Sequence, residues 1–279
     1  MTLRELKKKL LAKADSLENP YLEIRVLLSF LSISETEQIT SPDMLISPET
    51  EAEASALFER RINGTPMAYI TGEKEFYGHT FRVNESVLIP RPDTEILVEK
   101  AIETYREKKY TGRILDLCTG SGAIAASVSY ALNLDVAFSD ISSEALKTAQ
   151  ENYREITQRS SFDSRLGSLF EPWKGEKFSL IATNPPYLTR EWYEKTEKSV
   201  KKEPKKAFIG FGDDGMDIIK KIVLSSPQVL EKNGTLLIEC DYRQAESLTS
   251  FMKKNRFMNV RTARDLRNLE RVVYGEYEG

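Results

Sequence analysis

The feature that most constrains the fold is an alternation of two hydrophobic periods over the last two-thirds of the chain. Short apolar runs of strand length, of which 178–183 is the clearest, alternate with segments whose apolar residues recur every three or four positions. Strands separated by helices are typical of a mostly parallel sheet with helices on both faces, and two final strands without a helix between them predict an antiparallel edge. The predicted strands are 113–117, 134–139, 162–166, 178–183, 235–239, 259–264 and 271–277, and the predicted helices are 95–108, 123–132, 143–156, 216–230 and 243–254.

The first part of the chain has a different pattern. Leucines recur at helical spacing after Thr2-Leu3-Arg4-Glu5, which is typical of a capping box, and Asn63-Gly64 is a typical helix stop. We expect about four helices there. Residues 73–89 are rich in aromatic and β-branched side chains, which predicts a hairpin turning near Asn84-Glu85. The expected organisation is a helical substrate-recognition domain at 1–72, a β-hairpin connector at 73–89 and an α/β domain at 90–279.

Composition argues against several kinds of chemistry. The 279 residues include one histidine, His79, and two cysteines, Cys118 and Cys240, so we expect neither Ser-His-Asp catalysis nor a metal site. Residues 1–72 hold 8 Lys and Arg against 11 Asp and Glu, which accounts for the net charge of −3 and argues against direct DNA binding. No apolar run approaches the ~18 residues of a membrane helix, and no secretory signal is evident. We therefore expect a cytoplasmic monomer that does not bind membranes.

A glycine-containing loop follows the first strand of the α/β region. It runs from Asp116 to Gly122, and Asp140 lies twenty residues after Gly120, at the end of the next strand. A carboxylate at that spacing is typical of ribose binding. A dinucleotide site needs a GxGxxG triplet to receive a pyrophosphate, and here Cys118 precedes and Ala125 follows the two glycines, so no third glycine completes the triplet. S-adenosylmethionine has no phosphate and needs less of this loop, so a nucleoside cofactor is favoured over a purely structural glycine turn.

The sharpest motif is Asn184-Pro185-Pro186-Tyr187, directly after the strand 178–183. Ligands of open α/β sheets bind beyond the carboxyl ends of strands, and two prolines make this loop stiff. The Asn184 side-chain carbonyl and the Pro185 backbone carbonyl can accept both hydrogens of an NH₂ group. That contact favours loss of the nitrogen's conjugation and stabilises the positive charge it gains during methyl transfer. Tyr187 can pack on the flat acceptor group. The competing interpretation is a rigid exposed turn.

These motifs together resemble the HemK family of bacterial protein-(glutamine-N5) methyltransferases, which modify class I peptide chain release factors. The resemblance covers nearly the whole length. Asn-Pro-Pro-Tyr also occurs in nucleic-acid methyltransferases, so specificity depends on the helical region and on Pro90-Arg91-Pro92-Asp93-Thr94-Glu95. Further matching segments are Gly72–Phe76, Asp116–Gly122, Glu203-Pro204, Asp214-Gly215-Met216 and Glu270-Arg271-Val272.

The resemblance implies a seven-stranded Rossmann-like class I methyltransferase domain behind a small all-helical domain. It implies S-adenosylmethionine as donor, with S-adenosylhomocysteine as product, and the glutamine of the Gly-Gly-Gln motif of class I release factors as acceptor. The cofactor residues implied by position are Cys118, Thr119, Gly120, Ser121, Gly122, Asp140, Leu169 and Asn184. The acceptor residues are Asn184, Pro185, Pro186 and Tyr187, of which Asn184, Pro185 and Tyr187 are the expected catalytic residues.

Two positions depart from the family pattern. Cys118 replaces a common glycine, which a negative φ at this position would permit. Ser168 replaces an expected acidic residue, which puts a contact to the adenine amine in doubt. The lysine-rich stretch 195–206 is interpreted as a solvated face rather than a flap that meets an acidic partner. Two alternative functions stay open: an adenine-N6 or guanine-N2 nucleic-acid methyltransferase, and a dinucleotide oxidoreductase or non-catalytic cofactor-binding module.

Overall fold

The computed structural model describes residues 1–15 and 17–279. The chain divides into two compact units. Met1–Glu73 and Glu197–Lys202 form the first, and Lys74–Thr196 and Glu203–Gly279 form the second. The separate recognition and connector roles expected for 1–72 and 73–89 stay predictions.

The first unit is helical, as the sequence predicted. The Thr2 hydroxyl accepts from the Glu5 backbone N–H, and the Glu5 carboxylate accepts from the Thr2 N–H at 2.8 Å, which confirms the capping box. Asn63 caps the fourth helix and Gly64 follows with φ 98°, a conformation that favours glycine. Leu3, Leu6, Leu27 and Phe58 are among the core residues. Within the described part of this unit the α-helices are α1 (Leu3–Leu11), α2 (Pro20–Phe30), α3 (Glu35–Thr40), α4 (Pro48–Ile62) and α5 (Met67–Thr71), one more than expected.

The hairpin lies where the sequence predicted it, but the predicted turn was wrong. Strands β1 (Glu73–Phe76) and β2 (His79–Arg82) form a two-stranded sheet. The chain turns at Tyr77-Gly78, whose φ angles of 48° and 76° are both positive, as in a type I′ turn. Two-residue hairpin turns of this kind depend on glycine, and Gly78 was the overlooked signal. The turn was expected at Asn84, but the side-chain amide of Asn84 instead donates to the Thr148 hydroxyl, in the helix Ser143–Thr157.

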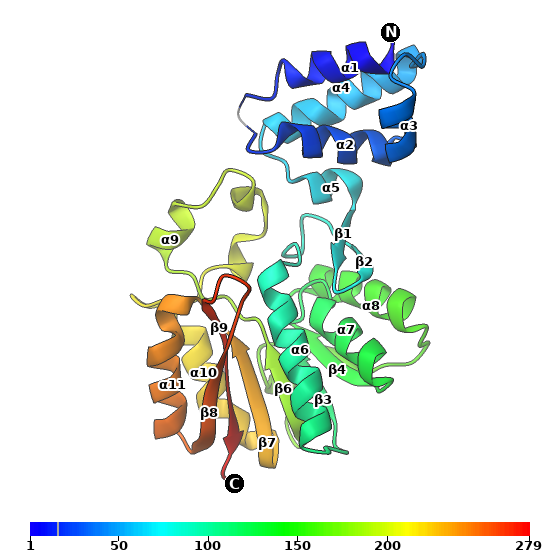
Figure 1. Ribbon diagram of the computed structural model, residues 1–279. Helices are drawn as coiled ribbons and strands as arrows, with labels where there is room; N and C mark the ends of the chain where they lie inside the picture. Colours follow the sequence, from blue (N-terminus) through cyan, green and yellow to red (C-terminus); the bar gives the residue numbers. More distant parts are fainter. Residues whose placement is uncertain (16) are drawn as a thin grey trace. The chain divides into compact units, whose positions relative to one another are not determined.

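A seven-stranded sheet, counted over the described residues, forms the centre of the second unit (Figure 1). The strand order is β5-β4-β3-β6-β7-β9-β8, and only β9 runs antiparallel to its neighbours, as expected for the predicted edge. Leu117 pairs with both Ser139 and Thr183, so β3, β4 and β6 end at the same level. The strands are β3 (Ile114–Leu117), β4 (Val136–Asp140), β5 (Ser164–Leu166), β6 (Phe178–Thr183), β7 (Leu230–Glu239), β8 (Phe257–Arg264) and β9 (Glu270–Tyr277).

Helices cover both faces of this sheet because successive strand residues point to opposite sides. Leu180 and Ala182 of β6 pack in one core with α6, α7 and α8, whereas Ile181 packs in the other with α10 and α11. Figure 1 shows these two helical layers. The α-helices of this unit are α6 (Pro92–Glu107), α7 (Ala123–Leu132), α8 (Ser143–Thr157), α9 (Arg190–Glu194), α10 (Asp217–Ser225) and α11 (Ala245–Lys254). Its 3₁₀ helices are η1 (Glu171–Trp173), η3 (Lys205–Ala207), η4 (Ser226–Gln228) and η5 (Tyr242–Gln244), whereas η2 (Val200–Lys202) belongs to the first unit.

One predicted helix is too long. The helix expected over 216–230 ends at Ser225, and Pro227 follows in η4. Proline cannot continue an α-helix because it lacks an N–H and clashes with the preceding turn. The next strand therefore starts at Leu230, five residues earlier than predicted. No helix in residues 1–15 and 17–279 is long and apolar enough to cross a membrane.

Candidate active site

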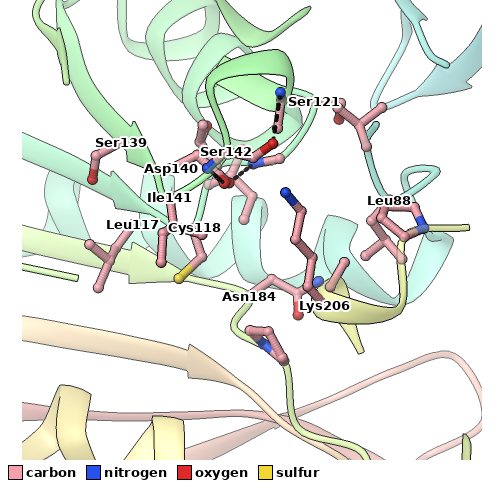
Figure 2. Close-up of a pocket in the computed structure, with 18 of the residues that line it drawn as sticks. Leu88, Leu117, Cys118, Ser121, Ser139, Asp140, Ile141, Ser142, Asn184 and Lys206 are labelled. Carbon is pink, nitrogen blue, oxygen red and sulfur yellow. Dashed lines mark hydrogen bonds between the residues drawn. The ribbon is translucent and has the colours of Figure 1, made fainter. Parts of the chain in front are cut away.

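A cavity of about 430 Å³ lies at the carboxyl ends of β3, β4 and β6. Its size is in the range of small-molecule sites. Figure 2 shows Cys118, Asp140 and Asn184 converging on it from the ends of these three strands. Among the other lining residues are Leu88, Arg91, Thr94, Leu117, Thr119, Gly120, Ser121, Ile141, Ser142, Ser168, Leu169, Pro186, Lys206 and Phe211.

Hydrogen bonds to the Asp116 carboxylate, within β3, hold the loop that follows this strand. One carboxylate oxygen accepts from the Thr119 hydroxyl at 2.5 Å and from the Ala125 N–H at 3.0 Å. Burial raises the pKa of Asp116 to about 7, and these two hydrogen bonds oppose that shift. Gly120 has φ 57°, and a side chain there would meet no atom within 4 Å. The backbone at Gly120 is therefore open to a ligand.

Gly122 has a different role from its neighbours. It was expected among the cofactor residues, but the structure does not place it in the cavity lining. A Cβ at Gly122 would lie 3.0 Å from the Ala149 backbone, so glycine lets α7 and α8 approach closely. Cys118, Thr119, Gly120 and Ser121 do line the cavity.

Cys118 has φ 61°, so the negative φ that would permit a residue other than glycine here is not present. A left-handed conformation costs a non-glycine residue about 1–2 kcal/mol. The loop nevertheless holds it, because the Thr119 N–H donates to the Ser139 carbonyl and the Thr183 hydroxyl donates to the Leu117 carbonyl. Burial raises the thiol's pKa, and the nearby Asp140 carboxylate adds to the shift, so this thiol stays protonated.

The backbone at Cys118 predicts an unusual order of stability. Cys118→Gly is expected to be more stable than Cys118→Ala by about 1 kcal/mol in urea unfolding, because only glycine adopts this φ without strain. Cys240 provides the matched control, since it is buried at the end of β7 and has no positive φ. There the alanine variant should be the more stable one. An alanine variant at Cys118 that is as stable as the glycine variant would contradict the argument.

Backbone N–H groups fix the orientation of the Asp140 carboxylate, at the end of β4. One oxygen accepts from the Gly120 N–H and the other from the Ser142 N–H, each at 2.9 Å. A carboxylate oxygen has two lone pairs, so each keeps one for a ligand hydroxyl. Ile141 follows it, lines the cavity and is 67% exposed. Its place directly after a strand-end carboxylate is the signal that could have identified it.

The Asn-Pro-Pro-Tyr loop leaves β6 with its side chains directed to different places. Asn184 and Pro186 line the cavity, whereas Pro185 is buried and Tyr187 lies outside the lining. The Asn184 amide donates from Nδ2 to the Thr94 hydroxyl at 3.1 Å. The Tyr187 hydroxyl donates to Glu239 at 3.3 Å.

This loop is packed tightly by its neighbours. Gln244 donates from Nε2 to the Tyr187 carbonyl at 2.8 Å and to the Asp214 carbonyl at 2.7 Å. A Cβ at Gly215 would lie 2.4 Å from the Tyr187 carbonyl oxygen, so that position requires glycine. Asp214 and Gly215, noted in the sequence, thus support the loop from outside the cavity.

Three polar residues of the site region carry roles that sequence reasoning left undecided or missed. Arg91 pairs with the buried Glu203, which also accepts from the Ile89 N–H at 3.0 Å, so this ion pair secures the segment before α6. Lys206 extends into the cavity (Figure 2), so the interpretation of its whole stretch as a solvated face is incomplete. Within the described residues, no cluster of three or more His, Cys, Asp or Glu side chains fits a metal ion.

The sheet order and the position of this cavity define the chain as a class I methyltransferase. Both depend on the same geometry, in which the loop after β3, the carboxylate ending β4 and the Asn-Pro-Pro-Tyr loop ending β6 meet at one edge. Solved structures share the fold. The hMettl16 catalytic domain in complex with MAT2A 3'UTR hairpin 1 aligns with a TM-score of 0.58 and 13% identity, over 92% of this chain and 91% of that one.

The sequence comparisons identify the family. Residues 2–72 match the model of the PrmC N-terminal domain, and residues 92–203 match that of the methyltransferase small domain. The chain belongs to the release factor glutamine methyltransferase family, in agreement with the HemK resemblance. It is 36% identical to the Neisseria gonorrhoeae release factor glutamine methyltransferase, over 92% of this chain and 94% of the relative. The corresponding protein of Borreliella burgdorferi is 40% identical over 75% of this chain and 72% of the relative.

Proposed function

We propose that this protein methylates the side-chain amide nitrogen of the glutamine in the Gly-Gly-Gln motif of class I peptide chain release factors. S-Adenosylmethionine is the proposed donor and S-adenosylhomocysteine the product. The helices of 1–72 are proposed to contribute to recognition of the release factor. Family membership supports the substrate, and one contact in the cavity supports the chemistry.

That contact is the hydrogen bond from Asn184 Nδ2 to Thr94. It uses the donor side of the amide and leaves Oδ1 as an acceptor at the cavity. Oδ1 and the Pro185 backbone carbonyl are proposed to accept the two hydrogens of the substrate amide. The two acceptors orient the nitrogen and stabilise the positive charge that it gains in the transition state. The extra proton can pass to water, so no general base is required of the chain.

The residues at the cavity fit a nucleoside cofactor with an amino-acid tail. Each Asp140 oxygen keeps a lone pair for a ribose hydroxyl, and the open backbone at Gly120 admits the tail. Cys118, Thr119 and Ser121 are proposed to line the tail, and Leu169 to contact the adenine. When bound, the cofactor supplies an electrophilic methyl group on a sulfonium. Tyr187 and Pro186 are proposed to pack beside the substrate amide.

The proposal predicts one methyl group on one glutamine. Purified release factor incubated with labelled cofactor and this protein should gain a single methyl, which tandem mass spectrometry should locate at Gly-Gly-Gln. A release factor with that glutamine replaced by alanine is the control and should stay unlabelled. Labelling of bare DNA or ribosomal RNA instead would favour the nucleic-acid alternative. A thermal shift by S-adenosylhomocysteine but not by NAD would exclude a dinucleotide enzyme.

A further inference from the structure

Two neighbouring lysines have different surroundings. Lys205 lies outside the cavity lining, and its ammonium is 3.9 Å from a Glu194 carboxylate oxygen and 5.3 Å from the centre of the Tyr193 ring. Lys206 lines the cavity, and Figure 2 shows its side chain extending into it. Among the described residues, the Lys206 ammonium has neither an ion pair nor a hydrogen bond. The chain therefore presents a cation to the cavity without neutralising it.

The backbone that carries Lys206 is fixed on both sides. Three residues before it, the buried Glu203 carboxylate accepts from the Ile89 N–H at 3.0 Å. Two residues after it, the Phe208 carbonyl accepts from the Leu188 N–H at 2.7 Å, and Leu188 directly follows the Asn-Pro-Pro-Tyr loop. This backbone is thus already ordered, so a ligand that binds the ammonium has to order only the side chain.

The Lys206 side chain is directed toward the carboxyl end of β4. In Figure 2 it extends from the side of Asn184 toward that of Asp140 and Ser142. Glu144, in the first turn of α8, agrees with this direction. Hydrogen bonds from its own backbone N–H and from the neighbouring serines lower the pKa of Glu144, and the positive charge of Lys206 adds to that effect. Charges in salt solution act on one another only over short distances, so the ammonium lies near the start of α8.

The proposed cofactor has one anionic group. S-Adenosylmethionine carries a sulfonium, and its amino-acid tail carries an ammonium and a carboxylate, whereas the ribose and the adenine are neutral. The tail is proposed to lie along the loop of Thr119 and Ser121, which lines the same cavity. An ammonium without a protein partner attracts the carboxylate of such a ligand and repels its two cationic groups.

We infer that Lys206 binds the carboxylate of the cofactor's amino-acid tail. The inference rests on the proposed function, which supplies the cofactor. The cavity lining holds two other cations, and both are less suited to this contact. Arg91 is already paired with Glu203. Lys221, on α10, also lines a second cavity together with Leu169, the residue proposed to contact the adenine.

Two ligands that differ in the carboxylate test this contact without turnover. S-Adenosylhomocysteine has the complete tail, and decarboxylated S-adenosylhomocysteine has the same tail without the carboxylate. Lys206→Met keeps the length of the side chain and removes its charge. Titration calorimetry should show that the variant binds S-adenosylhomocysteine about 3- to 10-fold more weakly than the parent does, because Lys206 is exposed and its contact lies between a surface ion pair and a buried one. The dissociation constant of the decarboxylated ligand should not rise.

Charge, rather than shape, should decide these affinities. Lys206→Arg should bind S-adenosylhomocysteine within about twofold of the parent, since a guanidinium also binds a carboxylate. Lys206→Gln should lose affinity as Lys206→Met does. Raising the salt concentration should weaken S-adenosylhomocysteine binding more in the parent than in Lys206→Met. An arginine variant as weak as the methionine variant would contradict the inference.

Two lysines provide matched controls. Lys205→Met, one residue away and outside the lining, should keep the parental affinity for both ligands. Lys221→Met should leave the ratio of the two dissociation constants at its parental value, because this lysine lies on the adenine side. The inference is overturned if Lys206→Met keeps the parental ratio, whether both affinities stay the same or fall together. It is also overturned if Lys221→Met, and not Lys206→Met, changes the ratio.

Failure of this inference can be distinguished from failure of the proposed function. If Lys206→Met changes the ratio but the parent methylates no glutamine, the proposed function fails and the carboxylate contact stands. If the parent methylates the release factor and the ratio is unchanged in Lys206→Met, only the inference fails. A variant that raises the KM for the release factor, with both dissociation constants at their parental values, would assign Lys206 to the protein substrate and overturn the carboxylate contact.

Discussion

Replacing Asn184 with alanine should abolish nearly all methyl transfer, with kcat reduced by about 10²- to 10³-fold or more. Asn184 supplies the only side-chain acceptor that we propose for the substrate amide, and the contact strengthens as the nitrogen becomes positive. An interaction of that kind lowers the barrier rather than the ground state. The variant should therefore lose kcat while S-adenosylhomocysteine still binds within about threefold of the parent. Single-turnover methylation and calorimetric binding would measure the two effects separately.

A matched control separates chemistry from folding. Asn255 lies at the end of α11, outside the cavity lining, and its amide donates locally, to the Phe251 carbonyl at 2.8 Å. Asn255→Ala should keep parental kcat. If Asn184→Ala retains near-parental turnover, the acceptor role is wrong. If it loses cofactor binding and kcat together, Asn184 serves mainly the cofactor.

Asp140→Ala should weaken cofactor binding about 10- to 100-fold. A hydrogen bond to a charged group contributes about 1.5–3 kcal/mol, and 1.4 kcal/mol corresponds to a factor of ten in affinity. The substitution removes both proposed ribose contacts and also releases the Gly120 and Ser142 N–H groups that the carboxylate holds. With saturating cofactor much of the activity should return, because Asp140 touches neither the methyl group nor the acceptor. Titration calorimetry with S-adenosylhomocysteine would measure the change in affinity.

The control for Asp140 lies at the other end of the same strand. Asp135 precedes β4, is 67% exposed at its side chain and pairs with Arg159. Asp135→Ala should leave the cofactor affinity unchanged, because exposed ion pairs contribute little. An Asp140→Ala variant with parental affinity would leave that carboxylate only the role of holding the loop.

Much of the fold could be predicted because its central strands, β3, β4 and β6, are buried on both faces. The strand 178–183 was predicted at its observed bounds, since a mostly apolar run of strand length is typical of a buried strand in an α/β chain. The predictions failed where one residue decided the outcome. Gly78 set the hairpin turn and Pro227 ended a helix, and neither changes the hydrophobic period on which the predictions depended.

The candidate site, like the fold, could be predicted only in part. Asp140 and Asn184 were identified because each lies at the carboxyl end of a strand, and strand ends in a parallel sheet meet at one edge. Thr94 and Glu239 were not assigned roles, although both lie in or beside recognisable segments. Thr94 at the start of α6 accepts from Asn184 and Glu239 at the end of β7 accepts from Tyr187, and no sequence period reports such contacts.

The sequence alone determined the class of fold, the family and the identity of the groups that meet at the sheet edge. These depend on local period, on turn chemistry and on which side chains follow which strands. Only the tertiary structure decided how those groups are used. It put Cys118 at a positive φ, left Gly122 and Tyr187 outside the cavity lining, and turned the Asn184 NH₂ group to the Thr94 hydroxyl. Backbone strain and hydrogen-bond direction are set by neighbours distant in the chain, so they become defined only when the sheet has formed.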